Sequence, residues 1–180
     1  MHILQGKTFM PASVLLVVVL LVASWTDVKS RRIPNWLTLA GMIAGLAVRA
    51  SMGPGPLADG ALGIGLGLLL AAPFFALGAL GGGDAKLLMA VGAFMGPADL
   101  ARASLVIALV GGLIALLQAA RRGVLLPTLA SCGSLLLSWA TLGRRGRDRT
   151  AVGGGRLTVP YGVAIAAGSL LWWFAGGLAS

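Results

Sequence analysis

The sequence predicts an all-α fold, a polytopic membrane helix bundle of about six transmembrane helices in a single integral membrane domain covering residues 1–180. The composition is 58% hydrophobic and only 11% charged, whereas soluble domains carry about 25% charged residues. Apolar runs of membrane-spanning length alternate with short polar segments. Basic residues lie between these runs, so the net charge of +9 indicates orientation by the positive-inside rule and no nucleic-acid partner.

The runs that predict helices follow one another along the whole chain, at residues 10–26, 35–50, 57–80, 85–97, 101–119 and 157–178. Three basic residues follow the first run while only Lys7 precedes it, which favours a retained span over a cleaved signal peptide. The fourth run is too short to cross a bilayer unaided. We therefore expect it to begin inside the bundle, with the preceding "GGGD" as partly unwound backbone covered by protein or water.

Segment 124–142 is apolar enough for a seventh span, but its serines and threonines fall on one helical face. This pattern predicts an amphipathic helix lying in the membrane interface. The stretch 143–156 then forms a basic cytoplasmic loop. With six spans, one side of the membrane keeps only Lys7, Arg49 and Arg102, and the other collects the remaining basic residues. Both termini are accordingly expected outside and the basic loops in the cytoplasm.

Glycines spaced four residues apart occur inside two predicted spans, Gly41 with Gly45 and Gly63 with Gly67. Small residues at this spacing allow neighbouring membrane helices to approach closely. We expect these four positions to serve helix packing.

Two of the five acidic residues lie at the ends of apolar runs on the same predicted side of the membrane. Asp27 ends the first run and Asp84 directly precedes the fourth. An ionisable residue at this depth is costly, which favours a functional role over a salt bridge to the basic neighbours, the structural alternative. Asp59 and Asp99 are interpreted as helix N-caps, and Asp148 as a partner of adjacent arginines.

Two neighbouring carboxylates cannot both ionise cheaply, so one retains a proton. The ionised member can take a proton from a water that attacks a peptide carbonyl, and the protonated member can donate to the carbonyl oxygen. The pair therefore predicts aspartic proteolysis, which needs no metal or cofactor. Only one histidine (His2) and one cysteine (Cys132) occur, so the sequence indicates no histidine relay, disulfide or metal site.

Three motifs resemble a known family and occur in its order. Gly81-Gly82-Gly83-Asp84 resembles the glycine-x-glycine-aspartate (GxGD) motif of intramembrane aspartyl proteases, and "GGGDAKLL" is similar to its version in type IV prepilin peptidases. "DVKSRRIPNWLTL", from Asp27, resembles that family's first site, with an aspartate, a basic residue and an Ile-Pro-Asn turn. "VPYGVAIAAG" at 159–168 resembles its final-helix motif.

The resemblance implies that Asp27 and Asp84 are the catalytic pair of a hydrolase, a prepilin peptidase. It implies a multi-pass protein of the bacterial inner membrane that removes a short basic leader at the cytoplasmic face. The substrate would be a prepilin whose hydrophobic helix stays in the bilayer, with pilus-assembly machinery as a further candidate partner. No cysteine segment associated with N-methyltransferase activity lies between Asp27 and Asn35, so the chain looks like the short, peptidase-only branch of tight-adherence (Flp) pilus systems.

Seven further residues are predicted to shape the site, from the motifs and from local chemistry: Gly81, Gly83, Lys86, Pro34, Asn35, Pro160 and Gly162. Gly81 and Gly83 admit backbone or substrate close to the Asp84 carboxylate, and Gly162 either lines the site or serves the start and packing of the last helix. The prolines are expected at early helical positions, where they set the turns. Lys86 either lowers the pKa of Asp84 or extends to the lipid headgroups. Two alternative functions remain: another GxGD intramembrane protease, or a non-enzymatic small transporter or pilus-assembly membrane protein.

Overall fold

The computed structural model describes residues 2–30, 32–76, 80–121 and 161–178. The regular elements in these ranges are all helices, which confirms the predicted all-α class: α1 (His2–Ser30), α2 (Asn35–Ala50), α3 (Pro54–Ala76), α4 (Gly82–Met95), α5 (Pro97–Arg121) and α7 (Tyr161–Leu178). The predicted interfacial helix at 124–142, the basic loop at 143–156 and Pro160 lie outside the described residues.

Each predicted apolar run contains a helix, and several helices extend beyond the predicted ends. Helix α1 continues past Asp27 to Ser30, so this aspartate lies within the helix instead of ending it. Of the "GGGD" stretch, which was expected to be partly unwound, Gly81 is extended and the other three residues belong to α4, which begins at Gly82. The Asp84 carboxylate accepts a hydrogen bond from the Gly81 N–H, and such a bond stabilises a helix start.

Three of the described helical stretches are long and apolar enough to cross a membrane: Pro11–Ser30, Pro54–Ala76 and Pro97–Gln118. Tyr161–Ala175 is a shorter apolar stretch. Large apolar side chains on these helices point outward, including Leu109, which is 75% exposed. Such surfaces suit a lipid environment. The fold is therefore that of a helical membrane bundle, and the number of spans stays a prediction.

The chain divides into two compact units, residues 1–111 with 160–180, and residues 112–159. Of the second unit the structure describes Gly112–Arg121, the C-terminal part of α5. The first unit contains helices α1–α4, α7 and the beginning of α5. The candidate site lies entirely within this first unit.

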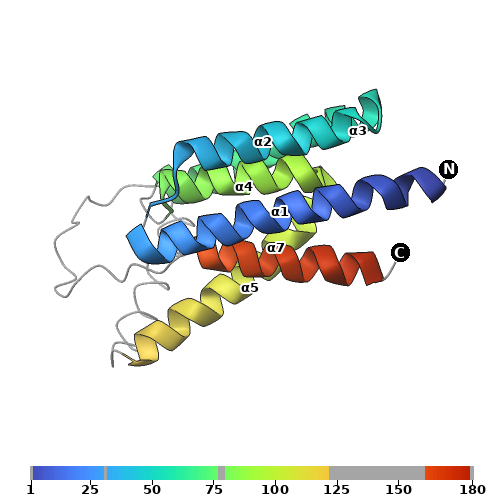
Figure 1. Ribbon diagram of the computed structural model, residues 1–180. Coiled ribbons are helices and arrows are strands. Elements are labelled where there is room, and N and C mark those ends of the chain that lie inside the picture. The colour runs from blue at the N-terminus through green and yellow to red at the C-terminus, as the bar shows by residue number, and fades with distance from the viewer. Residues whose placement is uncertain (1, 31, 77–79, 122–160, 179–180) are drawn as a thin grey trace, which may run out of the picture. The chain divides into compact units, whose positions relative to one another are not determined.

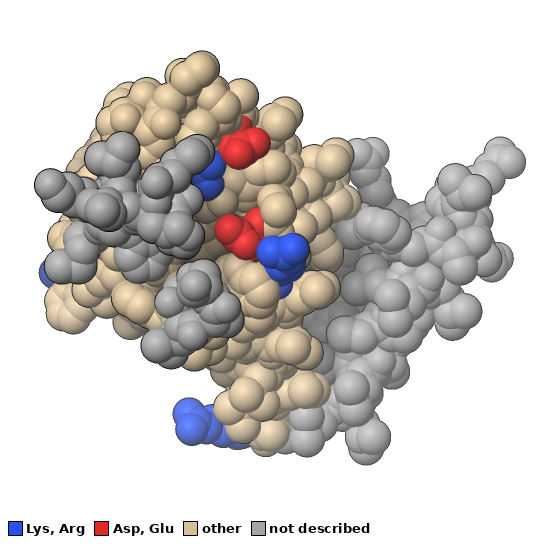
Figure 2. All heavy atoms as spheres, turned by 90° about the vertical axis from the view of Figure 1, so that its right-hand side faces the viewer, with Lys and Arg blue, Asp and Glu red and all other residues tan. Residues whose placement is uncertain are grey.

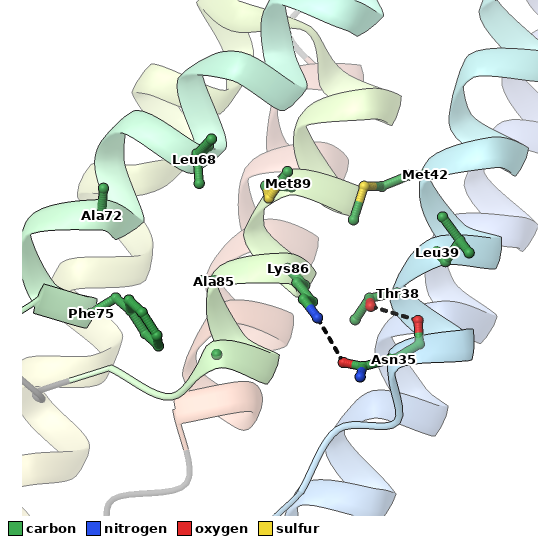
Figure 3. Close-up of a pocket in the computed structure, with 11 residues that line it drawn as sticks. Asn35, Thr38, Leu39, Met42, Leu68, Ala72, Phe75, Ala85, Lys86 and Met89 are labelled. Atoms are coloured by element: carbon green, nitrogen blue, oxygen red, sulfur yellow. Dashed lines mark hydrogen bonds between the residues drawn. The ribbon is translucent and has the colours of Figure 1, made fainter.

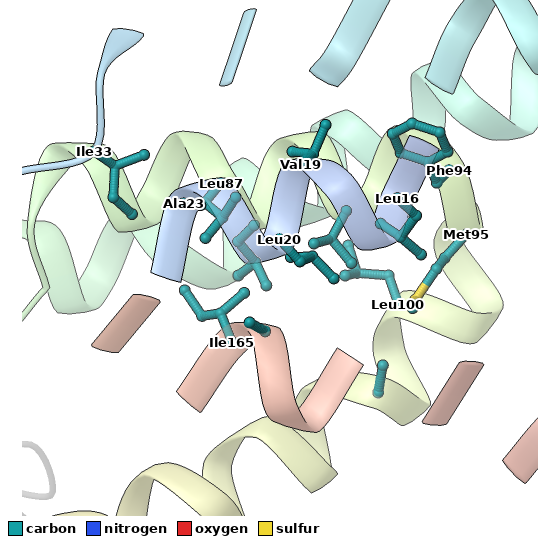
Figure 4. Close-up of a cluster of buried hydrophobic side chains, with 14 of the residues drawn as sticks. Leu16, Val19, Leu20, Ala23, Ile33, Leu87, Phe94, Met95, Leu100 and Ile165 are labelled. Atoms are coloured by element: carbon teal, nitrogen blue, oxygen red, sulfur yellow. The ribbon is translucent and has the colours of Figure 1, made fainter. Parts of the chain in front are cut away.

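Helix α4 is the centre of the first unit. It packs against α2 and α3 on one side and against α1 and α7 on the other. The buried cluster in Figure 4 joins α1, α4 and α7 through Leu16, Leu20, Leu87 and Ile165. Because lipid tails are as apolar as these side chains, the helices are held together by close van der Waals packing more than by the hydrophobic effect.

Glycines bring α2 and α3 close to α4, as predicted. A Cβ atom on Gly63 would overlap the Gly92 carbonyl group. A Cβ on Gly67 would lie 2.9 Å from the Met89 Cα, and one on Gly45 would lie 2.9 Å from the Ala93 Cβ. Both distances are shorter than real Cβ contacts, so these positions require glycine.

At the end where α2 finishes, Arg49 connects three helices. Its Nε donates to the Phe94 carbonyl oxygen at 2.9 Å and its Nη1 to the Pro56 carbonyl oxygen at 3.3 Å. The same Nη1 lies 4.0 Å from an oxygen of Asp59, and the Arg49 side chain is only 17% exposed. These bonds join α2 to both α3 and α4.

Acidic and basic side chains lie next to each other on the face shown in Figure 2. Arg49 and Asp59 form one ion pair of the described residues, and Arg102 and Asp99 form the other, at 3.4 Å. Neither aspartate occupies the N-cap position, since α3 begins at Pro54 and α5 at Pro97. The N-cap prediction for both is therefore wrong: Asp59 and Asp99 neutralise arginines.

Replacement of Gly63 tests the contact between α3 and α4. Gly63→Ala is expected to lower the free energy of unfolding by about 1–3 kcal/mol, because the added methyl group meets backbone that cannot move aside. The matched control is Gly65→Ala on the same helix, where a Cβ meets nothing within 4 Å. Thermal unfolding in detergent measures both variants, and equal melting temperatures would contradict the packing described.

Arg49 and Arg102 provide a second comparison. Arg49→Ala is expected to destabilise the protein by about 1–3 kcal/mol, because it removes two hydrogen bonds to backbone carbonyls inside the bundle. Arg102→Ala removes only an exposed ion pair, which contributes about 0–1 kcal/mol. The same unfolding assay distinguishes them, and a larger loss for Arg102→Ala would refute the role given to Arg49.

Candidate active site

Asp27 lies where the end of α1 meets the start of α7, since the two helices run antiparallel (Figure 1). Its carboxylate is buried, with the residue 8% exposed, and its Oδ2 accepts a hydrogen bond of 3.0 Å from the Gly162 N–H. Gly162 is the second residue of α7, and the first N–H groups of a helix have no partner within the helix. This free N–H is therefore available to bind the carboxylate.

Gly162 also permits the close approach of the two segments. A Cβ atom at this position would lie 2.8 Å from the Asp27 Oδ2 and 3.1 Å from its Cγ. Any other side chain would push the carboxylate away from its donor. Gly162 thus donates the hydrogen bond to Asp27, and its lack of a side chain leaves room for the carboxylate.

Asp84 lies in the first turn of α4, and its Oδ2 accepts a hydrogen bond of 3.2 Å from the Gly81 N–H. Its other oxygen, Oδ1, is buried and has no hydrogen-bond partner within the part of the chain that the structure describes. Buried polar atoms without a partner are rare in folded proteins. An oxygen in this state is suited to binding a proton, a water or a reacting group.

The two aspartates come from separate helices, α1 and α4, which pack against each other. Ile33 in the connection between α1 and α2 helps to set this arrangement. A Cβ on Gly83 would lie 3.0 Å from the Ile33 Cβ, so the start of α4 packs directly on that connection. We call Asp27 and Asp84 the carboxylate pair.

Lys86 contacts α2 and not the carboxylate pair. Its Nζ donates a hydrogen bond of 2.9 Å to the Asn35 Oδ1 (Figure 3). This bond joins the first turns of α4 and α2, a role that neither interpretation of Lys86 from the sequence included. Pro34 is extended at the N-cap of α2, one residue before the predicted early helical position. Its carbonyl oxygen accepts the Leu37 N–H at 3.1 Å.

An open groove of about 540 Å³ runs between α2, α3 and α4 beside the Lys86–Asn35 hydrogen bond (Figure 3). Its walls are mostly apolar, with Leu39 and Met42 from α2 and Leu68 and Phe75 from α3. Its floor is formed by small residues of α4, including Ala85. We call it the apolar groove.

Metal ligands do not gather in the described part of the chain, where no three His, Cys, Asp or Glu side chains meet. The sequence-based expectation of a reaction without metal or cofactor stays a prediction. The carboxylate pair by itself can exchange protons with water and with a carbonyl oxygen.

A family model of type IV leader peptidases matches residues 14–117. The match covers more than half of the 180 residues and includes both members of the carboxylate pair. The chain belongs to this family. A type IV leader peptidase is a membrane-associated protease, in agreement with the apolar helices. No curated protein and no solved structure matches the chain.

In this leader peptidase, Gly81 was predicted to admit close approach, and Gly162 to line the site or to serve the start and packing of the last helix. The structure adds that the N–H of each holds a carboxylate oxygen. It also adds Ile33, which the sequence analysis quoted within the Ile-Pro-Asn turn without assigning it a contact. Nothing in a single sequence indicates which backbone N–H a distant side chain will meet.

Replacement of Gly162 tests the support of Asp27. Gly162→Ala is expected to lower kcat for leader cleavage by roughly 10²-fold, because a displaced catalytic group loses its working geometry. Gly112→Ala serves as control, since a Cβ there meets nothing within 4 Å. Cleavage in detergent, with the melting temperature recorded in parallel, measures the effect. Full activity of Gly162→Ala would show that Asp27 does not depend on this contact.

Proposed function

We propose that the protein is a membrane-embedded aspartic endopeptidase that removes the short basic leader from Flp-type prepilins at the cytoplasmic face of the inner membrane. The catalytic groups are Asp27 and Asp84. The observation that carries the proposal is that two carboxyl groups far apart in sequence lie on helices that pack against each other, α1 and α4. Each of them is held through one oxygen by a glycine N–H.

The reaction follows from one proton shared by the pair. The ionised carboxylate takes a proton from water as the water oxygen attacks the carbonyl carbon of the scissile bond. The protonated carboxyl group gives its proton to the carbonyl oxygen, which produces a neutral tetrahedral intermediate. When the C–N bond breaks, the protonated carboxyl group gives its proton to the leaving amine, and the ionised carboxylate takes a proton from one hydroxyl group of the intermediate, whose oxygen forms the C=O bond of the product acid. The pair again holds one proton. Hydrogen bonds from Gly81 and Gly162 keep one oxygen of each group fixed throughout.

The charge distribution supports the cytoplasmic assignment. Lys29, Arg32 and Lys86 lie at the same end of the first unit as the carboxylate pair, and all three are exposed. The other end of the first unit has two basic residues in its described part, Arg49 and Arg102. An excess of Lys and Arg favours the cytoplasmic side of a membrane.

The peptidase-only assignment and the Flp class rest on the sequence between the two motifs. The connection from Asp27 to Asn35 is short and holds no cysteine, and the resemblance associates such members with leader cleavage without methyl transfer. In this proposal, residues 1–180 act as one peptidase domain in the lipid bilayer. The other two functions considered are a different GxGD protease and a transporter or assembly protein. No observation on the described residues favours either of them.

Substitution of single carboxylates tests the proposal. Asp27→Asn and Asp84→Asn are each expected to lower prepilin cleavage by roughly 10²–10⁴-fold or more, because the pair loses its proton exchange. Asp99→Asn, which removes an exposed carboxylate at the opposite end, is the matched control and should process normally. Immunoblots of a co-expressed prepilin measure precursor and mature forms. Normal maturation by either variant of the pair would exclude the assignment.

A further inference from the structure

We propose that the apolar groove receives the hydrophobic helix of the leader-bearing substrate. From there the substrate chain crosses the glycine-rich start of α4 to reach the carboxylate pair. This inference rests on the proposed function and assigns a docking surface to the same site. It would make α2, α3 and α4 the part of the protein that selects substrates by their hydrophobic helix, while the leader interacts with the other side of α4.

The dimensions and lining of the groove suit an apolar helix. Its α2 wall extends from Asn35 to Met42, a rise of about 10 Å or two helical turns. Leu39 and Leu68 line the groove and are more than half exposed, although they are large and apolar. A helix laid in such a groove inserts side chains spaced three and four residues apart, the usual mode of helix recognition.

The groove and the carboxylate pair share the first turn of α4. Gly82, Ala85 and Lys86 line the groove. Asp84 is two residues before Lys86, so its side chain points about 200° away around the helix at 3.6 residues per turn, toward Asp27. A chain leaving the groove therefore has to pass around the start of α4 to reach the pair.

The start of α4 leaves room for this passage. Gly81 and Gly82 are exposed and carry no side chain. Among the described residues, a Cβ on Gly82 would meet Phe75 alone, at an ordinary contact distance of 3.5 Å. In Figure 3 the Lys86–Asn35 hydrogen bond joins α4 to α2 at this end, and Ala85 in the first turn of α4 lies between Lys86 and Phe75. An extended backbone can pass closely over bare glycine.

The lining of the groove matches the apolar helix of such a substrate and not its basic leader. Among the described residues that line the groove, the only charged one is the cation Lys86, which repels a basic leader. The carboxylate pair lies on the other side of α4, with the exposed Lys29 and Arg32 at the same end. A substrate whose helix lies in the groove and whose scissile bond reaches the pair therefore places its leader beyond the pair. An anionic lipid would instead place its phosphate on Lys86, and the experiment below distinguishes the two occupants.

Photo-cross-linking tests the docking surface directly. A benzophenone amino acid is placed at Met42 or Leu68, which line the groove, in the Asp27→Asn background so that the bound prepilin is not cleaved. Controls carry the same group at the adjacent exposed positions Ile43 and Leu69, which do not line it. Irradiation in membranes is expected to give several-fold more adduct with the hydrophobic helix of prepilin from positions 42 and 68 than from 43 and 69.

Two outcomes overturn the inference while leaving the proposed function intact. One is equal prepilin adducts from groove and control positions, and the other is adducts with lipid alone from the groove, in each case with normal processing by the unsubstituted enzyme. Failure of the unsubstituted enzyme to cleave prepilin would instead overturn the proposed function, and the inference with it.

A kinetic comparison provides an independent measurement. Ala72→Trp fills the groove from the α3 wall and is expected to raise KM several-fold with little change in kcat, because it blocks docking and leaves the carboxylates in place. Ala61→Trp, at an exposed position of α3 outside the groove, should leave both constants unchanged. An unchanged KM for a folded Ala72→Trp enzyme contradicts the docking surface.

Discussion

Each carboxylate of the pair has one oxygen that accepts a hydrogen bond, and in this protein glycine N–H groups at two helix starts are the donors. These two hydrogen bonds fix much of the first unit. Helix α7 has to begin beside Asp27, and the preceding glycine of α4 has to remain extended so that its N–H turns back toward Asp84. Both donors are free because they belong to first turns, where a helix cannot satisfy its own N–H groups. The carboxylate pair is thus assembled from helix ends.

The start of α4 has a defined position because the rest of the helix packs against several neighbouring helices. Gly45 and Gly63 remove the side chains that would keep α2 and α3 at a distance from it. Arg49 joins its C-terminal end to the same two helices through the Phe94 and Pro56 carbonyl oxygens. Close packing of this kind replaces the hydrophobic effect in a bilayer, and it gives a helix of only 14 residues a defined position.

The two ends of the first unit differ in how their charges are compensated. At one end, Arg49 and Arg102 form ion pairs with carboxylates. At the other end, Lys86 donates a hydrogen bond to an asparagine, and Asp27 and Asp84 accept hydrogen bonds from glycine N–H groups. The carboxylates of the pair consequently keep their capacity for proton exchange, which a strong ion pair would remove by holding both groups ionised. In the proposed mechanism, the end that carries the carboxylate pair is the one at which the reaction takes place.

The sequence alone determined the helical membrane class, the approximate extent of each described helix and the glycines of close packing, and it predicted that two aspartates form one site. These properties follow from hydropathy, spacing and residue type, which are local. Tertiary structure decided that Gly81 and Gly162 donate to the carboxylates, that Gly83 packs on Ile33, that Lys86 binds Asn35, and that Asp59 and Asp99 pair with arginines instead of capping helices. Each of these contacts depends on which helix ends meet in space. A backbone N–H has the same chemistry in every residue except proline, so no residue pattern marks the one that a distant carboxylate will find.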